Sequence, residues 1–274
     1  MFFLKLFGGS VLEGANGAVT GPAAQRRRLA LLAVLSMARG RPVGRERLIG
    51  LLWPEHPTDA ARHLLSESLY VLKKKLGEGA FSTGGDEVVL RGEVVCCDAN
   101  EFEAALEAGD AEGAARLYRG PFLDGVYVPD APEFERWVET ERDRLARLYA
   151  RAVERLADMA EADGRPLEAA EWWRKAAACD PYSSRVTLRL MRALDAAGER
   201  AGALRAAETH STLLRADLEV EPDPEVLSYV ERLRTEAARA ASAAATSWAA
   251  TFLSDLPPPS AGTRTIAVAE VDET

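Results

Sequence analysis

Between residues 58 and 76, polar and basic side chains recur at the spacing of one helix face. On a helix that advances about 100° per residue, this stripe and its shoulder consist of Arg62, His63, Ser66, Glu67, Tyr70, Lys73 and Lys74. Such side chains can hydrogen-bond base edges in the major groove of DNA, while Arg and Lys pair with phosphates. The spacing therefore predicts groove contacts by His63, Ser66, Tyr70 and Lys74, with phosphate contacts by Arg62 and Lys73.

A second basic cluster, Arg26-Arg27-Arg28, is expected in the first turn of an earlier helix. Helix N-termini present unpaired N–H groups and partial positive charge, so these arginines are predicted phosphate contacts. Arg91 follows Asp86 and Glu87 in a segment expected to form a hairpin, and it is a further predicted DNA contact. Because carboxylates repel phosphates, the tip of this hairpin is expected to bind DNA weakly.

Two observations weigh against a nucleic acid. Glu67 lies in the middle of the stripe and would repel phosphates, although it could accept a hydrogen bond from a cytosine amino group. A basic helix face such as that of Lys73-Lys74-Lys75 is, taken alone, more often a solvated surface. The order of the surrounding elements favours DNA.

Three helices are expected to position the stripe: residues 23–37, residues 44–52, and a third from Thr58 or Asp59 to Gly77. Thr58 or Asp59 is expected to cap the start of the third helix, and Gly77 its end. The face opposite the stripe is apolar and is expected to be buried against the other two helices; it consists of Ala61, Leu65, Leu69, Leu72 and Leu76.

Strands are expected on both sides of these helices. Residues 1–25 alternate short apolar stretches with glycines and predict a small antiparallel sheet. In residues 81–98, Gly84-Gly85-Asp86-Glu87 can turn between two strands, and residues 88–90 and 94–96 are rich in β-formers. Sheet, three helices and hairpin is the order of a winged helix-turn-helix, although a generic α+β domain can share it.

Helical periodicity dominates from residue 100 to about 240. Apolar residues at spacings of three and four predict one long amphipathic helix over residues 133–163. Gly164 and Gly198 lie 34 residues apart, as do Ala169 and Ala203 in the Ala-rich segments that follow. This is the period of the tetratricopeptide repeat, in which small residues let paired helices approach closely. An unrelated helical bundle is the alternative.

The predicted fold is mainly α, with an N-terminal winged helix-turn-helix (α+β) followed by an all-α tetratricopeptide-like helical-repeat domain. We expect the DNA-binding domain in residues 1–98, the helical domain in residues 99–240 and a flexible linker or tail in residues 241–274. Within the tail, residues 265–269 could form a strand.

Charge is distributed unevenly along the chain of 274 residues, whose net charge is −9. Residues 1–76 carry 12 Lys and Arg against 5 Asp and Glu, a net charge of +7. Residues 96–274 carry 21 against 34, a net charge of −13. A basic head on an acidic body is typical of a DNA-binding protein whose helical part contacts other proteins.

Signatures of enzymes are absent from the sequence. There is no phosphate-binding G-x-x-x-x-G-K-[ST], no G-x-G-x-x-G, no G-x-S-x-G and no H-E-x-x-H. Cys96, Cys97 and Cys179 form no C-x-x-C pair, and no histidine has metal-ligand spacing with them. We therefore expect no enzyme activity, no cofactor and no metal site. The odd number of cysteines and the lack of a signal peptide or membrane span predict a cytoplasmic protein.

Several segments together resemble the Streptomyces antibiotic regulatory protein (SARP) family. The matching segments are residues 41–54, 60–62, 72–77, 117–124, 141–142, 180–181, 190–194 and 218–225. The first three resemble the family's DNA-binding domain, and the others its bacterial transcriptional activator domain (BTAD). The likeness covers roughly residues 2–236, and it rests on the order and spacing of the segments.

The resemblance implies an OmpR-type winged helix-turn-helix whose third helix is the recognition helix. It also implies a transcriptional activator that binds promoter repeats in double-stranded DNA, often as a homodimer, and contacts RNA polymerase. Two positions depart from the family pattern: Val71 stands where an Arg is common, and Gly44 where a Ser or Thr usually caps the second helix. The first departure predicts the loss of one DNA contact.

A protein-interaction scaffold is the alternative function. In that case the tetratricopeptide-like domain would bind a peptide or signalling partner, and the DNA-binding domain would be vestigial. Glu67, Asp86 and Glu87 and the acidic second half of the chain favour this alternative.

Overall fold

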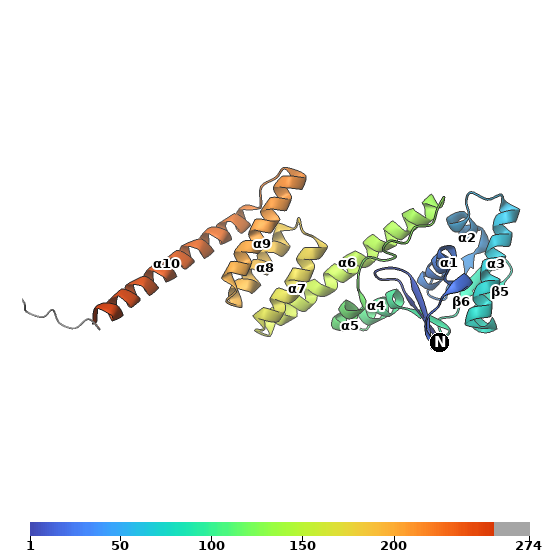
Figure 1. Cartoon of the computed structure of the whole chain (residues 1–274), viewed down its shortest axis with the longest axis horizontal. Helices are drawn as coiled ribbons and strands as arrows, with labels where there is room; N and C mark the ends of the chain where they lie inside the picture. Colours follow the sequence, from blue (N-terminus) through green and yellow to red (C-terminus); the bar gives the residue numbers. More distant parts are fainter. Residues whose placement is uncertain (255–274) are drawn as a thin grey trace, which may run out of the picture. The chain divides into compact units, whose positions relative to one another are not determined.

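The structure is a computed structural model that describes residues 1–254, apart from some side chains in strand β5 and in the last helix. The segment containing the expected strand at residues 265–269 lies outside the described residues. The chain divides into two compact units, Met1–Pro222 and Asp223–Thr274. The elements of the first unit, coloured blue to orange in Figure 1, are mostly helical and include two small sheets.

The N-terminal sheet contains one strand that the sequence analysis placed elsewhere. Strands β1 (Phe2–Lys5), β2 (Val11–Gly14) and β3 (Gly17–Ala18) are antiparallel, as expected. The fourth strand, β7 (Val95–Cys97), pairs in parallel with β1 and gives the order β3-β2-β1-β7. Residues 94–96 were expected in the hairpin region; a turn closed by the Val94 N–H on the Arg91 carbonyl (3.0 Å) instead directs the chain to β1.

The hairpin itself consists of β5 (Phe81–Gly84) and β6 (Glu87–Leu90), with Gly85 at its tip in the left-handed region (φ 60°). A short strand, β4 (Val43–Gly44), pairs with the other edge of β6, so this second sheet has the order β4-β6-β5. The predicted turn at residues 84–87 is confirmed.

Three helices lie between β3 and β5 in sequence: α1 (Arg26–Met37), α2 (Arg45–Leu52) and α3 (Thr58–Leu76). All five residues of the predicted buried face of α3 are at most 7% exposed, which confirms the helix-wheel assignment. Gly77 ends α3 with φ 105°, as expected, but Pro57 precedes its first residue and no side chain caps it. The predicted caps Thr58 and Asp59 lie inside the first turn. A short 3-10 turn, η1 (Gly21–Ala24), occupies the expected start of α1.

In the first unit, seven further helical segments follow β7. They are α4 (Asp98–Glu107), α5 (Ala111–Leu117), α6 (Pro132–Ala162), α7 (Pro166–Cys179), α8 (Ser184–Ala196), α9 (Arg200–Leu213) and the π-helical η3 (Leu214–Leu218). From α6 to α9 each helix packs against the next one. The long amphipathic helix predicted over residues 133–163 is therefore confirmed as α6.

The 34-residue spacing corresponds to equivalent turns and contacts. Gly164 (φ 69°) precedes α7 and Gly198 (φ 79°) precedes α9, each in a backbone conformation that favours glycine. Ala169 and Ala203 are fully buried in these two helices. Because each of these side chains is only a methyl group, neighbouring helices can pack closely, as the repeat predicted.

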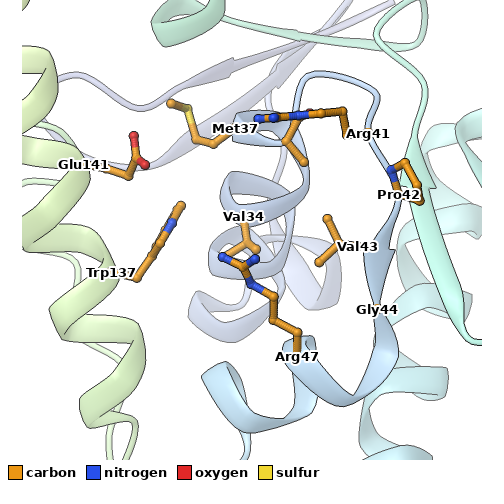
Figure 2. Close-up of a pocket in the computed structure, with 10 residues that line it drawn as sticks. Val34, Met37, Arg41, Pro42, Val43, Gly44, Arg47, Trp137 and Glu141 are labelled. Atoms are coloured by element: carbon orange, nitrogen blue, oxygen red, sulfur yellow. The ribbon is translucent and has the colours of Figure 1, made fainter.

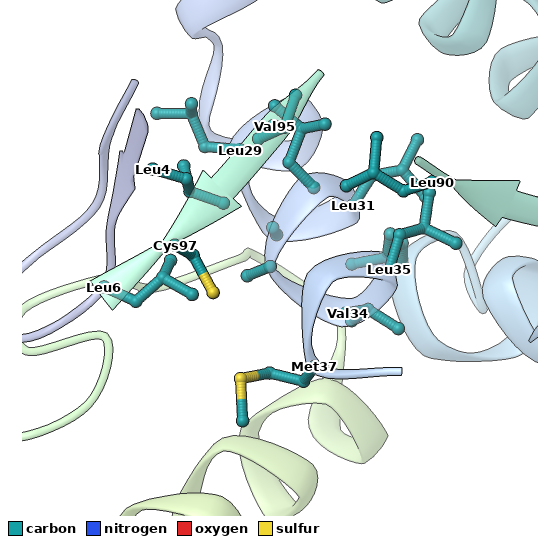
Figure 3. Close-up of a cluster of buried hydrophobic side chains, with 14 of the residues drawn as sticks. Leu4, Leu6, Leu29, Leu31, Val34, Leu35, Met37, Leu90, Val95 and Cys97 are labelled. Atoms are coloured by element: carbon teal, nitrogen blue, oxygen red, sulfur yellow. The ribbon is translucent and has the colours of Figure 1, made fainter. Parts of the chain in front are cut away.

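One hydrophobic cluster joins the N-terminal sheet, α1 to α3 and the start of the helical region, and it runs from Leu4 to Leu145. In Figure 3, Leu4 from β1 and Val95 from β7 lie near Leu29 of α1. The rings of Phe7 and Phe102 meet edge to face with centroids 5.4 Å apart. The core thus continues past residue 98. The boundary between a DNA-binding domain (residues 1–98) and a helical domain (residues 99–240) stays a prediction.

The second unit contains α10 (Pro224–Ser254). The helix extends beyond residue 240, where the linker was expected to begin; the rest of that expected linker, residues 255–274, lies outside the described residues. Among residues 1–254 the structure contains no helix that is both long and apolar enough to cross a membrane.

Asp98, the first residue of α4, ties the two halves of this core together. Its Oδ1 accepts hydrogen bonds from the Leu6 N–H (2.8 Å) and the Ala99 N–H (2.8 Å), and its Oδ2 accepts one from the Phe7 N–H (3.1 Å). Burial raises the pKa of this carboxyl group, although the three N–H donors act in the opposite direction. The carboxylate satisfies backbone donors at the end of β1 and the start of α4 at once.

Asp98→Asn is therefore expected to lower the free energy of unfolding by about 1–3 kcal/mol, because an amide has one acceptor oxygen and its NH2 group would face an N–H donor. Urea denaturation followed by circular dichroism measures the change. Asp124→Asn, at an exposed position, is the matched control and should leave the midpoint unchanged. Equal stability of the two variants would contradict the proposed role of Asp98.

Candidate nucleic-acid interface

The structure places the predicted stripe on the outer face of α3. Arg62, His63, Ser66, Tyr70 and Lys74 are exposed, and Lys73 is half-buried on the shoulder. Tyr70 is the most informative member, because 66% of this large aromatic residue is exposed. Its exposure leaves both a ring edge and a hydroxyl group available to a partner.

Two members of the stripe are partly engaged within the protein. The Ser66 hydroxyl donates to the Arg62 carbonyl one turn earlier (2.9 Å), and its remaining lone pairs stay accessible. The Arg62 guanidinium pairs with Glu46 of α2 (2.7 Å) and lies 3.8 Å from Asp59. Together these carboxylates raise the pKa of Arg62, and the hydrogen bond that Arg62 donates to Glu46 is the largest cause. Arg62 is thus paired at the surface through contacts that are open to solvent.

The arginine run at the start of α1 is divided among three environments. Arg26 is exposed. Arg27 pairs with Glu55 (2.5 Å) and donates to the Pro129 carbonyl (2.8 Å), so it links α1 to the segment before α6. Arg28 is 7% exposed and donates to the Pro22 carbonyl (2.8 Å) and to Glu67 (2.8 Å). The run predicted as one phosphate-binding cluster does not act as a unit.

The contact between Arg28 and Glu67 explains the acidic residue that did not fit the stripe. The Glu67 carboxylate, half exposed, accepts a charge-assisted hydrogen bond from the nearly buried guanidinium of α1. Glu67 therefore fixes α3 against α1, and its charge is largely balanced before any partner arrives.

Arg91 and the hairpin tip lie at opposite ends of β6. The Arg91 N–H donates to the Ala80 carbonyl (2.9 Å), which places this residue beside the end of α3. At the tip, the Asp86 carbonyl accepts the N–H of Arg45, the first residue of α2 (2.7 Å). The structure therefore does not bring Arg91 together with the acidic tip.

Two further exposed basic residues of the N-terminal part were not predicted as contacts. Arg41 and Arg47 are both exposed and come from the connection between α1 and α2 and from the first turn of α2. The signal was present in the segment Arg41-Pro42-Val43-Gly44-Arg45-Glu46-Arg47, in which three of the seven residues are arginine. Their places depend on a turn at Arg39 and Gly40 that periodicity does not specify.

Comparison with known proteins identifies the family. Residues 95–234 match the profile of the bacterial transcriptional activator domain. The chain therefore belongs to this family, and the resemblance to SARP-type regulators is confirmed.

The curated relatives that the chain matches are regulatory proteins. The chain is 28% identical over 235 residues to the transcriptional regulatory protein EmbR of Mycobacterium tuberculosis and of Mycobacterium bovis, covering 77% of this chain and 58% of the relative. It is 28% identical over 213 residues to the regulatory protein AfsR of Streptomyces griseus, covering 74% of this chain and 22% of that protein. The chain thus spans little more than half of EmbR and less than a quarter of AfsR.

A solved structure confirms the predicted fold class. Mycobacterium tuberculosis EmbR, in complex with a low-affinity phosphopeptide, matches with a TM-score of 0.62 and 26% identity, covering 86% of this chain and 65% of that one. The mainly helical architecture with a small N-terminal β region is shared by the two proteins.

Arg28→Gln is expected to lower the free energy of unfolding by about 1–3 kcal/mol, since it leaves the Pro22 carbonyl and the Glu67 carboxylate without their charged donor. Urea denaturation tests this change against Arg26→Gln, which is expected to unfold at the parent's midpoint. A double-mutant cycle with Glu67→Gln should show coupling between the two positions. If Arg28→Gln and Arg26→Gln unfolded alike, the structural role of Arg28 would be excluded.

Proposed function

We propose that the protein is a transcriptional activator that binds double-stranded DNA in a sequence-specific manner, with α3 as its recognition helix. One observation carries the proposal: an exposed face of mixed basic and hydrogen-bonding side chains on α3, whose opposite face is buried in a three-helix core. An α-helix of this kind fits the major groove. Membership of the bacterial transcriptional activator domain family supports the same function.

The proposed contacts are fewer than those expected from the sequence. His63, Ser66, Tyr70 and Lys74 are proposed to read base edges. Arg26, Arg62, Lys73 and Arg91 are proposed to contact phosphates, with Arg27 in a secondary role because its guanidinium is shared with Glu55 and Pro129. Arg28 is assigned to the fold instead.

The ion pair of Arg62 does not prevent this role. Both its side chain and that of Glu46 are more than half exposed, at 57% and 64%. Exposed pairs of this kind contribute little to stability, so a phosphate can replace the carboxylate as the partner of Arg62.

The helical region is proposed to contact RNA polymerase, and two copies are proposed to bind adjacent promoter repeats as a homodimer. Its stacked helices α6 to α9 present an extended surface on a strongly acidic half of the chain. This activity places the protein in the cytoplasm, with no catalytic role. Run-off transcription from a bound promoter, with and without the protein, separates an activator from a repressor.

Binding to DNA is tested by gel shift with fragments from upstream of the genes adjacent to its own. The dissociation constant should rise steeply between 50 and 200 mM salt, because phosphate neutralisation releases counterions. Lack of salt-sensitive binding even at the lowest salt would exclude the DNA-binding function. A stoichiometric protein partner recovered under those conditions would support the scaffold alternative.

Lys74→Gln is expected to weaken binding and, if Lys74 also neutralises a phosphate, to reduce the slope of log K against log salt by about 0.9. Lys175→Gln, at an exposed position on α7, is the matched control and should leave both unchanged. Fluorescence anisotropy at several salt concentrations measures the slope. Identical behaviour of the two variants would remove Lys74 from the interface.

Tyr70→Ala should reduce the preference for the specific site over random DNA by about tenfold, because a base contact is worth about 1–3 kcal/mol while non-specific binding depends on phosphates. Competition with unrelated DNA gives this ratio. An equal loss of affinity for both DNAs would show that Tyr70 contacts the backbone.

A further inference from the structure

A cavity of about 330 Å³ opens where the DNA-binding head meets α6. Its residues come from the end of α1, from the connection that leads to β4 and α2, and from the first half of α6 (Figure 2). The volume lies at the lower end of the range typical of small-molecule sites, about 300–1,000 Å³. None of these lining residues is among the proposed DNA contacts.

Apolar side chains from two elements form facing walls of this cavity. Val34 and Met37 of α1 are 6% and 9% exposed, and Trp137 of α6 lies opposite Val34 in Figure 2. The indole ring of Trp137 packs edge to face on Phe122, with centroids 5.8 Å apart, and against Phe134 at 5.6 Å. The ring is therefore held in position, and the space between it and α1 suits a flat apolar group.

Two guanidinium groups give this space a positive charge. Arg47 extends from α2 toward Val34, and Arg41 extends toward Met37 (Figure 2). Among residues 1–254, the side chain of Arg47 forms no hydrogen bond or ion pair, and that of Arg41 donates only its Nε to the Ala38 carbonyl (3.1 Å). The acidic residue at the rim, Glu141, is already paired with Arg144 (2.8 Å). The two arginines therefore lack a counter-ion that the protein supplies.

We propose that this cavity binds a small aromatic carboxylate. Its ring would lie between Trp137 and Val34, and its carboxylate would accept hydrogen bonds from Arg41 and Arg47. Guanidinium groups pair with carboxylates through two parallel N–H donors, which makes them well suited to such a ligand.

Binding at this position would connect a small molecule to DNA affinity. The walls belong both to the head that carries α3 and to α6, so the ligand would favour the arrangement in which these walls are closest. This effect on DNA rests on the proposed function; binding of the carboxylate does not, and the two are measured separately.

Isothermal titration calorimetry of the full chain with 2-naphthoate tests the site directly. We expect one binding site per chain, and binding at least tenfold weaker for the uncharged analogue 2-naphthalenemethanol. Arg47→Gln should weaken naphthoate binding by about tenfold, which corresponds to about 1.4 kcal/mol. Trp137→Leu should weaken binding of both compounds.

Arg136→Gln, an exposed position next to Trp137 on α6, is the matched control and should bind like the parent. Circular dichroism verifies that each variant is folded. Absence of naphthoate binding to the parent, or equal binding by Arg47→Gln and Arg136→Gln, would overturn the proposal. Naphthoate binding without any effect on DNA affinity would keep the site but remove its link to DNA.

Discussion

The arrangement of the N-terminal half depends on the contacts that residues 95–98 make with the first strand of the chain. Strand β7 pairs in parallel with β1, and the Asp98 carboxylate that follows accepts the N–H groups of Leu6 and Phe7. A strand that begins the chain and a helix that begins the helical region are thereby fixed to the same point. Because buried backbone donors must find acceptors, the N-terminal strand cannot separate here from α4 without leaving the N–H groups of Leu6 and Phe7 unsatisfied.

Two ion pairs on α3 show why burial decides the role of an arginine. Arg28 is nearly buried, so its guanidinium needs the Glu67 carboxylate and the Pro22 carbonyl permanently, and it serves the packing of α1 on α3. Arg62 pairs with a carboxylate that is itself mostly exposed, and water can replace that partner at little cost. Arg28 on α1 is therefore structural, whereas Arg62 on α3 is available to an anion.

Periodicity and turn chemistry predicted the parts of the fold that are local. The buried face of α3 depends on neighbours within one or two helical turns, and the equivalent positions of Gly164 and Gly198 depend on a repeated spacing. The parallel pairing of β7 with β1 and the contact of Arg28 with Glu67 join residues far apart in sequence, which no local pattern encodes. The same holds for the candidate site. The exposed face of α3 was predictable from local spacing, but the arginines that remain free to contact DNA were not, because their ion pairs join residues far apart in sequence.

Helix α6 connects the N-terminal core to the stacked helices α7 to α9. Its 31 residues span about 46 Å at 1.5 Å per residue. Near its start, Phe134 and Val138 belong to the core of the head, while Ala157 and Ala160 near its end are buried in the stack of small side chains. Interiors packed this closely deform little, so a helix fixed at both ends moves as one rod. A shift of its first turns against α1 would therefore also displace the surface formed by α7 to α9, without a hinge between them.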